Sequence, residues 1–209
     1  MTTPELNRIS EVGAYVEIIE RSVSTGEAKG SDERKVAIHN LYREAVREAK
    51  RLQAGKDDIQ SISAAVRNVF ELHLIINKLE QSEDAVKHWI GQLQNDALEI
   101  HDGIIALVSK EGLNHDAFTA SKARILKSGE THGVVPCRPF RIKDIAAEFG
   151  WTEAYDAMYK LCSKIVHPSS IRVNLPGAFD QNDDYKNTLI HVGVHHMALI
   201  AAQSQREFA

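Results

Sequence analysis

The sequence predicts an all-α protein, a multi-helix bundle around a central apolar helix at about residues 57–81, with no significant sheet. Strand signals are nearly absent, because no segment alternates cleanly between apolar and polar residues. Helical periodicity runs along most of the chain instead. Apolar residues make up 43% and charged residues 26% of the 209 positions, which is ordinary for a globular domain. We expect one domain over residues 1–209, large enough to fold without a disulfide or a metal.

Residues that start or stop helices set the order of the predicted elements. Pro4 suits a first helical turn, and Ser31 or Asp32 can cap the second helix. Gly55 ends that helix after a basic run, as glycine does at helix C-termini. Ser82 starts the fourth helix, with two acidic residues in its positive first turn. The predicted helices cover residues 4–26, 32–54, 57–81, 83–111, 115–128, 142–149, 152–167 and 184–207.

The third of these helices is expected to lie at the centre of the bundle. Its segment 69–76 is apolar almost all the way round, which indicates burial on most sides. His73 falls on an apolar face, where a histidine is usually a hydrogen-bonded core residue. Arg67 and Glu71 are four residues apart and share another face. An ion pair on so apolar a helix either faces a cleft or is desolvated, and a desolvated pair serves specificity more than stability.

A histidine closes the helix at 152–167, because Pro168 disfavours helical geometry in the residue before it. One face of this helix is an apolar stripe of Trp151, Ala154, Tyr155, Met158, Leu161, Cys162 and Ile165. The opposite face carries Asp156, Lys160, Ser163 and His167. The partial negative charge of a helix C-terminus favours the imidazolium form, and a charge switch near physiological pH suits a proton donor or an anion-binding group. The alternative is a solvated polar face whose last residue is histidine by chance.

The stretch "IAAEFGWTEAYDAMYKLCSKIVHPSS" resembles the signature region of a family of uncharacterised, all-helical, mostly bacterial proteins. The family pattern is roughly Ala, four residues, Gly, two tyrosines, and then Ser-x-x-x-His-Pro-Ser. The matching positions are Ala146 or Ala147, Gly150, Tyr155, Tyr159, Ser163, His167, Pro168 and Ser169. Members also carry Arg-x-x-x-Glu on an earlier apolar helix, which Arg67 and Glu71 match. The resemblance covers about residues 57–175, between a helical pair at 1–54 and a helix at 184–207, and implies a fold and a site more than an activity.

The helical make-up also resembles the HEPN superfamily of helical RNA-processing and nucleotide-associated domains. Catalytic members use Arg, four to six residues, and then His as a metal-independent ribonuclease site. Two segments have this spacing, "RKVAIH" with Arg34 and His39, and "RNVFELH" with Arg67 and His73. Residues five or six apart do not share a helix face well. The resemblance therefore leaves ribonuclease activity open.

Two further patterns are candidate sites. His191 and His195 are four residues apart, a spacing that can chelate zinc or another divalent metal, and they are the weak metal candidates of this chain. The alternative is a polar patch between helices. The segment 142–161 resembles a helix-turn-helix, but Glu153 and Asp156 would face DNA phosphates with the wrong charge. DNA binding is therefore disfavoured, and no cofactor is expected.

Positive charge gathers in residues 122–143, which contain six basic residues and one acidic residue in a chain of net charge −4. One interpretation is a solvated basic helix and loop. The other is an anion-facing surface that includes Arg138 and Arg141. The irregular stretches 128–141 and 167–183 are long for a compact domain, and such loops are more often functional than idle.

The sequence also indicates a compartment. The chain has two cysteines, Cys137 and Cys162, which favours free thiols in a reducing environment. No basic segment followed by an apolar core marks a signal peptide at the start, and no stretch approaches the ~18 apolar residues of a membrane span. We expect a cytoplasmic protein without membrane contact.

These observations lead to two hypotheses. In the first, a phosphate-bearing ligand, either a nucleotide or RNA, binds where His167 donates a hydrogen bond or proton, Arg67 neutralises charge and Glu71 orients Arg67. Other ligand-binding candidates are Tyr159, Ser163, Ser169, Arg138 and Arg141. Cleavage of RNA by its 2′-hydroxyl needs no metal, and His167 could then act as general acid–base.

The second hypothesis is non-catalytic. The His-Pro-Ser segment would be a buried, hydrogen-bonded knot tied to Arg67 and Glu71, and the function would lie in protein–protein contact. The expected partners are thus an anionic small molecule, RNA or another protein, and the sequence allows a homo-oligomer.

Overall fold

A computed structural model describes residues 4–25, 33–175 and 177–208, and it confirms the all-α prediction. The described residues form ten helices and no strand. The helices are α1 Pro4–Thr25, α2 Glu33–Ala54, α3 Ile59–Gln81, α4 Glu83–Lys110, α5 Asp116–His132, α6 Ile142–Glu148, α7 Thr152–Val166, α8 Ser170–Asn174, α9 Gly177–Asp180 and α10 Asp183–Glu207. The predicted cap of α2, Ser31 or Asp32, lies outside the described residues. The largest boundary difference is in α5, which ends at His132, four residues beyond its predicted end. Gly133, with φ 65°, follows as its C-cap.

The chain divides into two compact units. Unit 1 contains the described residues of 1–80 and 142–209, and unit 2 contains residues 81–141. The single domain over residues 1–209 stays a prediction.

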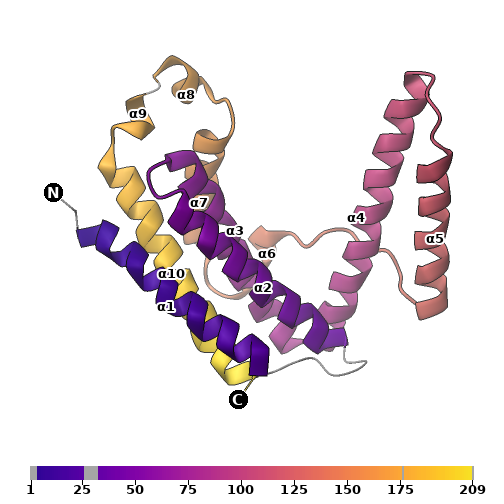
Figure 1. Ribbon diagram of the computed structural model, residues 1–209, viewed down its shortest axis with the longest axis horizontal. Helices are drawn as coiled ribbons and strands as arrows, with labels where there is room; N and C mark the ends of the chain where they lie inside the picture. The colour runs from indigo at the N-terminus through magenta and orange to yellow at the C-terminus, as the bar shows by residue number, and fades with distance from the viewer. Residues whose placement is uncertain (1–3, 26–32, 176, 209) are drawn as a thin grey trace. The chain divides into compact units, whose positions relative to one another are not determined.

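The long helices of unit 1 do not all run in the same direction. α1 and α10 lie side by side and run the same way (Figure 1), with the Arg8 guanidinium against the His191 ring near their starts. α2 runs the opposite way, as a contact between its start and the end of α10 shows. Arg34 donates to both carboxylate oxygens of Glu207, at 2.8 and 3.2 Å. The Phe208 ring comes next in the chain and packs edge-on against two rings of α2. Those rings belong to His39 and Tyr42.

α3 is the buried centre of unit 1, as predicted. Seven of the eight residues from 69 to 76 are buried, and Glu71 is the exception. Gly193 lets α10 approach α3 closely, because a Cβ there would lie 2.8 Å from Cγ2 of Val66 and 3.0 Å from Cδ2 of Leu52. The side chains of α7 pack on α3 from another side, in antiparallel order, since Tyr155 lies near Phe70 and Tyr159 near Arg67.

The stretch 167–183 was expected to be irregular, and this expectation was wrong, because it contains α8 and α9. Ser169 caps α8, where its Oγ accepts a hydrogen bond from the Arg172 backbone N–H at 3.4 Å. The same Oγ donates to the Lys164 carbonyl oxygen at 2.7 Å. The Arg172 guanidinium donates to the next two carbonyls, of Ile165 and Val166, at 2.8 and 3.1 Å. Short polar residues after a proline thus satisfy the end of α7 and start a new turn.

Unit 2 is a hairpin of α4 and α5 with an extended return segment, residues 133–141. Ser82 caps α4 as predicted, accepting from the Ala85 N–H at 3.3 Å. The return segment runs along α4, where the Cys137 N–H donates to the Gly91 carbonyl at 3.1 Å. Gly91 has to be glycine, because a Cβ would lie 2.3 Å from the Val135 carbonyl oxygen. None of the described helices combines the length and the apolar character that a membrane span needs.

Candidate functional site

The predicted Arg67–Glu71 pair exists and is joined by Tyr159 of α7. Arg67 Nε donates to Glu71 Oε1 at 2.8 Å, with 32% and 24% of the two side chains exposed. The Arg67 guanidinium carbon lies 5.2 Å from the centre of the Tyr159 ring, within the range of a cation–π contact. The pair is therefore neither buried nor fully solvated, and it lies at the surface between α3 and α7. We call Arg67, Glu71, Tyr155 and Tyr159 the Arg67 cluster.

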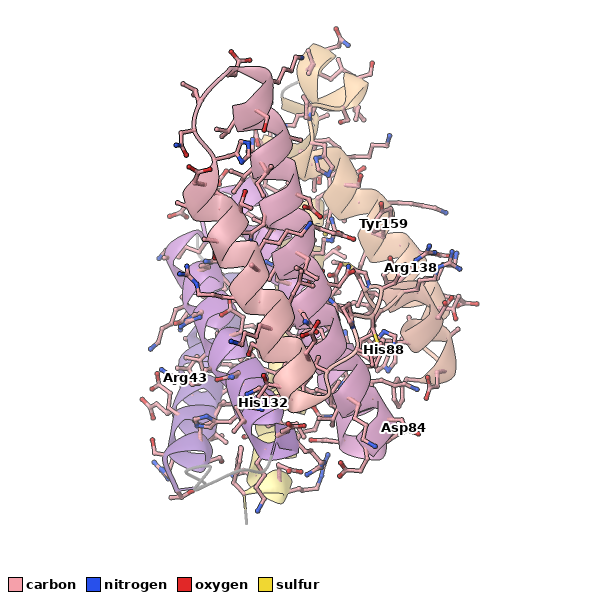
Figure 2. All side chains as sticks on the ribbon, turned by 90° about the vertical axis from the view of Figure 1, so that its right-hand side faces the viewer. Arg43, Asp84, His88, His132, Arg138 and Tyr159 are labelled. Atoms are coloured by element: carbon pink, nitrogen blue, oxygen red, sulfur yellow. The ribbon has the colours of Figure 1, made fainter. Side chains whose placement is uncertain are left out.

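The two tyrosines of the Arg67 cluster form a stacked pair. Their ring centres are 5.8 Å apart and their planes 24° apart, and 46% of Tyr159 is exposed (labelled on α7 in Figure 2). Burial raises the pKa of Tyr155, and the Glu71 carboxylate raises it further. The hydrogen bond to Glu71 raises the pKa of Arg67, so this guanidinium is charged at every physiological pH. The cluster therefore presents a permanent cation beside a partly exposed aromatic ring.

The Ser-x-x-x-His-Pro-Ser residues lie further along α7. His167 is the C-cap residue, with φ −87° and ψ 156°, and its side chain is exposed. No hydrogen bond or ion pair among the described residues involves its imidazole. It lies eight residues after Tyr159, which is about 12 Å along a helix axis. Ser163 lies between them and is half-buried, while Ser169 is held by the carbonyl of Lys164.

Arg138 and Arg141 belong to unit 2, where both are exposed. The Arg138 carbonyl oxygen lies 2.8 Å from His88 Nε2, and the His88 ring stacks on Phe140 with ring centres 4.4 Å apart. Figure 2 shows His88 and Arg138 close together beside α4. The two arginines thus belong to the return segment of unit 2.

Unit 1 also contains a buried polar network that the sequence did not reveal. His73 of α3 and His196 of α10 are 4% and 2% exposed, and their Nδ1 atoms are 3.0 Å apart. Asn77 Nδ2 lies 3.1 Å from His73 Nε2, and Gln203 Nε2 donates to Asn77 Oδ1. This confirms His73 as a hydrogen-bonded core residue. Its partner His196 was not predicted, because the spacing in "HVGVHH" pointed to two other histidines.

Both buried histidines are neutral at pH 7. Burial lowers the pKa of His73 to about 4 and that of His196 to about 3. The aromatic rings of Phe70 and Trp151 surround them, at 4.5 and 5.1 Å from the His196 ring centre. Two neutral imidazoles that face each other need one donor and one acceptor. The pair is therefore suited to holding α3 and α10 in register, and it has no open face for a ligand.

The weak metal candidates are outside the buried network, although the His195 ring lies 5.3 Å from that of His196. The His191 ring contacts the Arg8 guanidinium, and the exposed His195 ring lies 6.1 Å from that of Trp151. In the described ranges no three His, Cys, Asp or Glu side chains are grouped to hold a metal ion. Both cysteines are free thiols, with Cys162 buried and Cys137 half-buried.

The two Arg–His spacings of the HEPN type are also separated in space. Arg34 pairs with Glu207, while His39, five residues later on α2, contacts Phe208. Arg67 lies in the surface cluster and His73 in the interior. In both segments the arginine and the histidine thus have different partners.

Comparison with known proteins found no relative of this chain. No family model, no curated protein and no solved structure matches the chain. The function of the site therefore has to follow from the chemistry of its own residues. The Arg67 cluster can neutralise an anion, stack on a planar group and accept a hydrogen bond through Glu71.

Proposed function

We propose that unit 1 binds a phosphate-bearing ligand with a planar base, a nucleotide or single-stranded RNA, at the Arg67 cluster. One observation carries this proposal: a guanidinium fixed by Glu71 lies over an exposed tyrosine ring. Arg67 uses Nε for Glu71, so its two terminal nitrogens are available to grip a phosphate in a bidentate manner. Tyr159, which is 46% exposed, would supply aromatic surface for the base, since stacking on an aromatic side chain is worth ~1–3 kcal/mol per base.

Glu71 has two roles in this proposal. Its Oε1 holds Arg67 in place, and its other oxygen can accept a hydrogen bond from the exocyclic or ring N–H of a base. A carboxylate repels a phosphate placed directly on it, so the phosphate belongs on the far side of the guanidinium. The ligand would thus lie with its base toward Glu71 and its phosphate toward solvent.

His167 enters the proposal only for a ligand longer than one nucleotide. At about 12 Å from Tyr159 along α7, its imidazole would reach a neighbouring nucleotide of an RNA strand, with Ser163 between the two positions. There it could protonate the leaving 5′-oxygen while the 2′-hydroxyl, losing its proton to water, attacks the phosphorus and forms a 2′,3′-cyclic phosphate. Relationship to the Ser-x-x-x-His-Pro-Ser family and to HEPN-like domains is part of the same proposal.

The test is a titration of the full chain with AMP and with a ten-nucleotide single-stranded RNA. Tyr159→Ala and Arg67→Gln should each weaken binding of both ligands about tenfold or more. Tyr185→Ala is the matched control, because Tyr185 is an exposed tyrosine of the same unit that packs on Phe179. Equal affinities for the wild type, the two cluster variants and the control would remove the proposal.

The catalytic part is tested separately with His167→Ala. If His167 acts on RNA, this variant should bind the ten-nucleotide RNA normally and lose cleavage of it. An unchanged cleavage rate would exclude a proton-transfer role for His167, and it would leave the binding proposal untouched.

A structural role for the His-Pro-Ser segment is the second candidate, favoured by the hydrogen bonds of Ser169 and Arg172 to the last carbonyls of α7. Under this alternative, Arg172→Ala lowers the unfolding midpoint and no ligand of the Arg67 cluster is found. His167→Ala then has little effect on stability, because its side chain is exposed.

A further inference from the structure

A groove of about 550 Å³ lies between α1 and α2 in unit 1. Its walls are Glu20, Val23 and Ser24 of α1, and His39, Arg43, Val46 and Arg47 of α2. We call it the α2 groove. It shares no residue with the Arg67 cluster, so a ligand bound in it is independent of the proposed nucleotide site.

The α2 wall of the groove is a row of basic side chains. His39, Arg43 and Arg47 are each four residues apart, so they lie on one helix face with about 6 Å between successive positions. Like charges at this spacing destabilise a helix by a few tenths of a kcal/mol per pair. Arg43 and Arg47 are such a pair, and a bound anion would offset their repulsion.

The acidic residues near the row each have a basic partner, and one of these partners is Arg47 of the row itself. Glu20 accepts from Lys50 Nζ at 2.7 Å, and Glu44 accepts from Arg47 Nη1 at 2.7 Å. Arg43 makes no hydrogen bond or ion pair within the described part of the chain. It is exposed on α2 and points outward (Figure 2). The groove thus offers one unopposed guanidinium and a second with nitrogens to spare.

We infer that the α2 groove binds a chain of linked phosphate groups, with Arg43 as its principal anchor. Arg43 and Arg47, one helical turn apart, suit two linked anions better than a single one, since successive phosphates can each meet one guanidinium. Ser24 lies on the opposite wall, where its hydroxyl donates to the Glu20 carbonyl oxygen at 2.7 Å, and Val23 and Val46 supply apolar surface between the polar groups. The ligand chemistry is a linked phosphate chain, and its source is either the backbone of single-stranded RNA or a soluble polyphosphate.

The experiment compares Arg43→Glu with Arg124→Glu in the full-length protein. Both arginines are exposed and both changes alter net charge by the same amount, but Arg124 lies on α5 in unit 2. The probes are tripolyphosphate, by calorimetry, and a fluorescent twelve-nucleotide single-stranded RNA, by anisotropy at several salt concentrations. Arg43→Gln repeats the test with a milder change, and circular dichroism checks that each variant is folded.

We expect Arg43→Glu to weaken binding of at least one probe tenfold or more, with less than a twofold effect for Arg124→Glu. The slope of log affinity against log salt should become shallower by about one for the RNA in Arg43→Gln. Loss of RNA binding alone identifies the nucleic-acid backbone as the source, and loss of both probes identifies the phosphate chain itself.

Equal effects of the two charge reversals would overturn the inference, because net charge alone would then explain the binding. Absence of binding by the wild type at low salt would overturn it as well. Tyr159→Ala keeps the two proposals apart, since it should leave tripolyphosphate binding unchanged. A result in which Tyr159→Ala abolishes that binding and Arg43→Glu does not would assign the phosphate to the Arg67 cluster.

Discussion

His73 and His196 lie with their Nδ1 atoms 3.0 Å apart in the interior of unit 1, although they are 123 positions apart in the chain. Burial keeps both rings neutral, and the unfolded chain offers them water and an ordinary pKa. Because the pKa values differ between the folded and unfolded states, the pair makes the free energy of unfolding depend on pH.

Acid should destabilise unit 1 well above the range in which carboxylates titrate. Both folded-state pKa values, about 4 and about 3, are lowered from 6.5, so the unfolded state binds protons first as pH falls. The stabilising contribution is present above pH 6.5 and is lost progressively below it. Between pH 7 and pH 5 we expect a loss of about 2 kcal/mol per histidine.

This loss can be followed in a Trp89→Phe background, where Trp151 is the remaining tryptophan and reports on unit 1 from its place beside His196. Urea unfolding at pH 7 and pH 5 gives the difference. Adding His196→Gln should reduce it by about half. A pH-independent free energy of unfolding over this range would contradict the burial of the pair.

The network also predicts which nitrogen of each ring carries the proton. The Asn77 amide can only donate from Nδ2, so His73 Nε2 accepts, and His73 must carry its proton on Nδ1. That proton is donated to His196 Nδ1, which leaves the His196 proton on Nε2. Long-range ¹⁵N–¹H correlation spectra distinguish these forms directly. If both rings carried the proton on the same nitrogen, the predicted directions of these hydrogen bonds would be wrong.

Replacing each of two glycines by alanine should change the stability of the protein in opposite directions. Gly193→Ala forces a methyl group against Val66 and Leu52, and we expect a loss of ~1–3 kcal/mol from overpacking. Gly103→Ala on α4 meets no atom within 4 Å and should stabilise its helix by up to ~1 kcal/mol. Thermal unfolding followed by circular dichroism measures both. Stabilisation by Gly193→Ala would mean that α3 and α10 pack less closely than described.

The two thiols should differ in reactivity. Burial raises the pKa of Cys162, so both its accessibility and its thiolate fraction are low, whereas Cys137 is half-buried. Under native conditions a disulfide-exchange reagent should label one thiol quickly, and the second only after denaturant is added. Peptide mapping should identify the fast thiol as Cys137, and fast labelling of Cys162 would contradict the prediction.

The helices could be predicted because their signals are local. Ser82, the basic run before Gly55 and the proline after His167 each act within a turn or two, and the structure places helix ends beside all three. The burial of His73 was equally predictable, since the apolar residues on both sides of it are its neighbours in sequence.

The rest depends on pairings that no local pattern carries. His195 and His196 differ by one position, yet a rotation of about 100° sends one ring to the surface and the other to the core. Arg67 and Tyr159 were predicted to belong to one ligand site, but their direct contact joins positions 92 apart and follows from no local pattern. The row on α2 is visible in the sequence, because His39, Arg43 and Arg47 are spaced four residues apart. It was hidden because acidic residues are interspersed with it.

The contact of Phe208 with His39 makes the last turn of α10 a neighbour of the α2 groove. A purification tag fused after this turn, or a protease that trims it, would also disturb the fork between Arg34 and Glu207. Preparations that differ only at their C-termini should therefore differ in their affinity for polyanions. An assay on a C-terminally tagged protein would measure a lower affinity of the α2 groove.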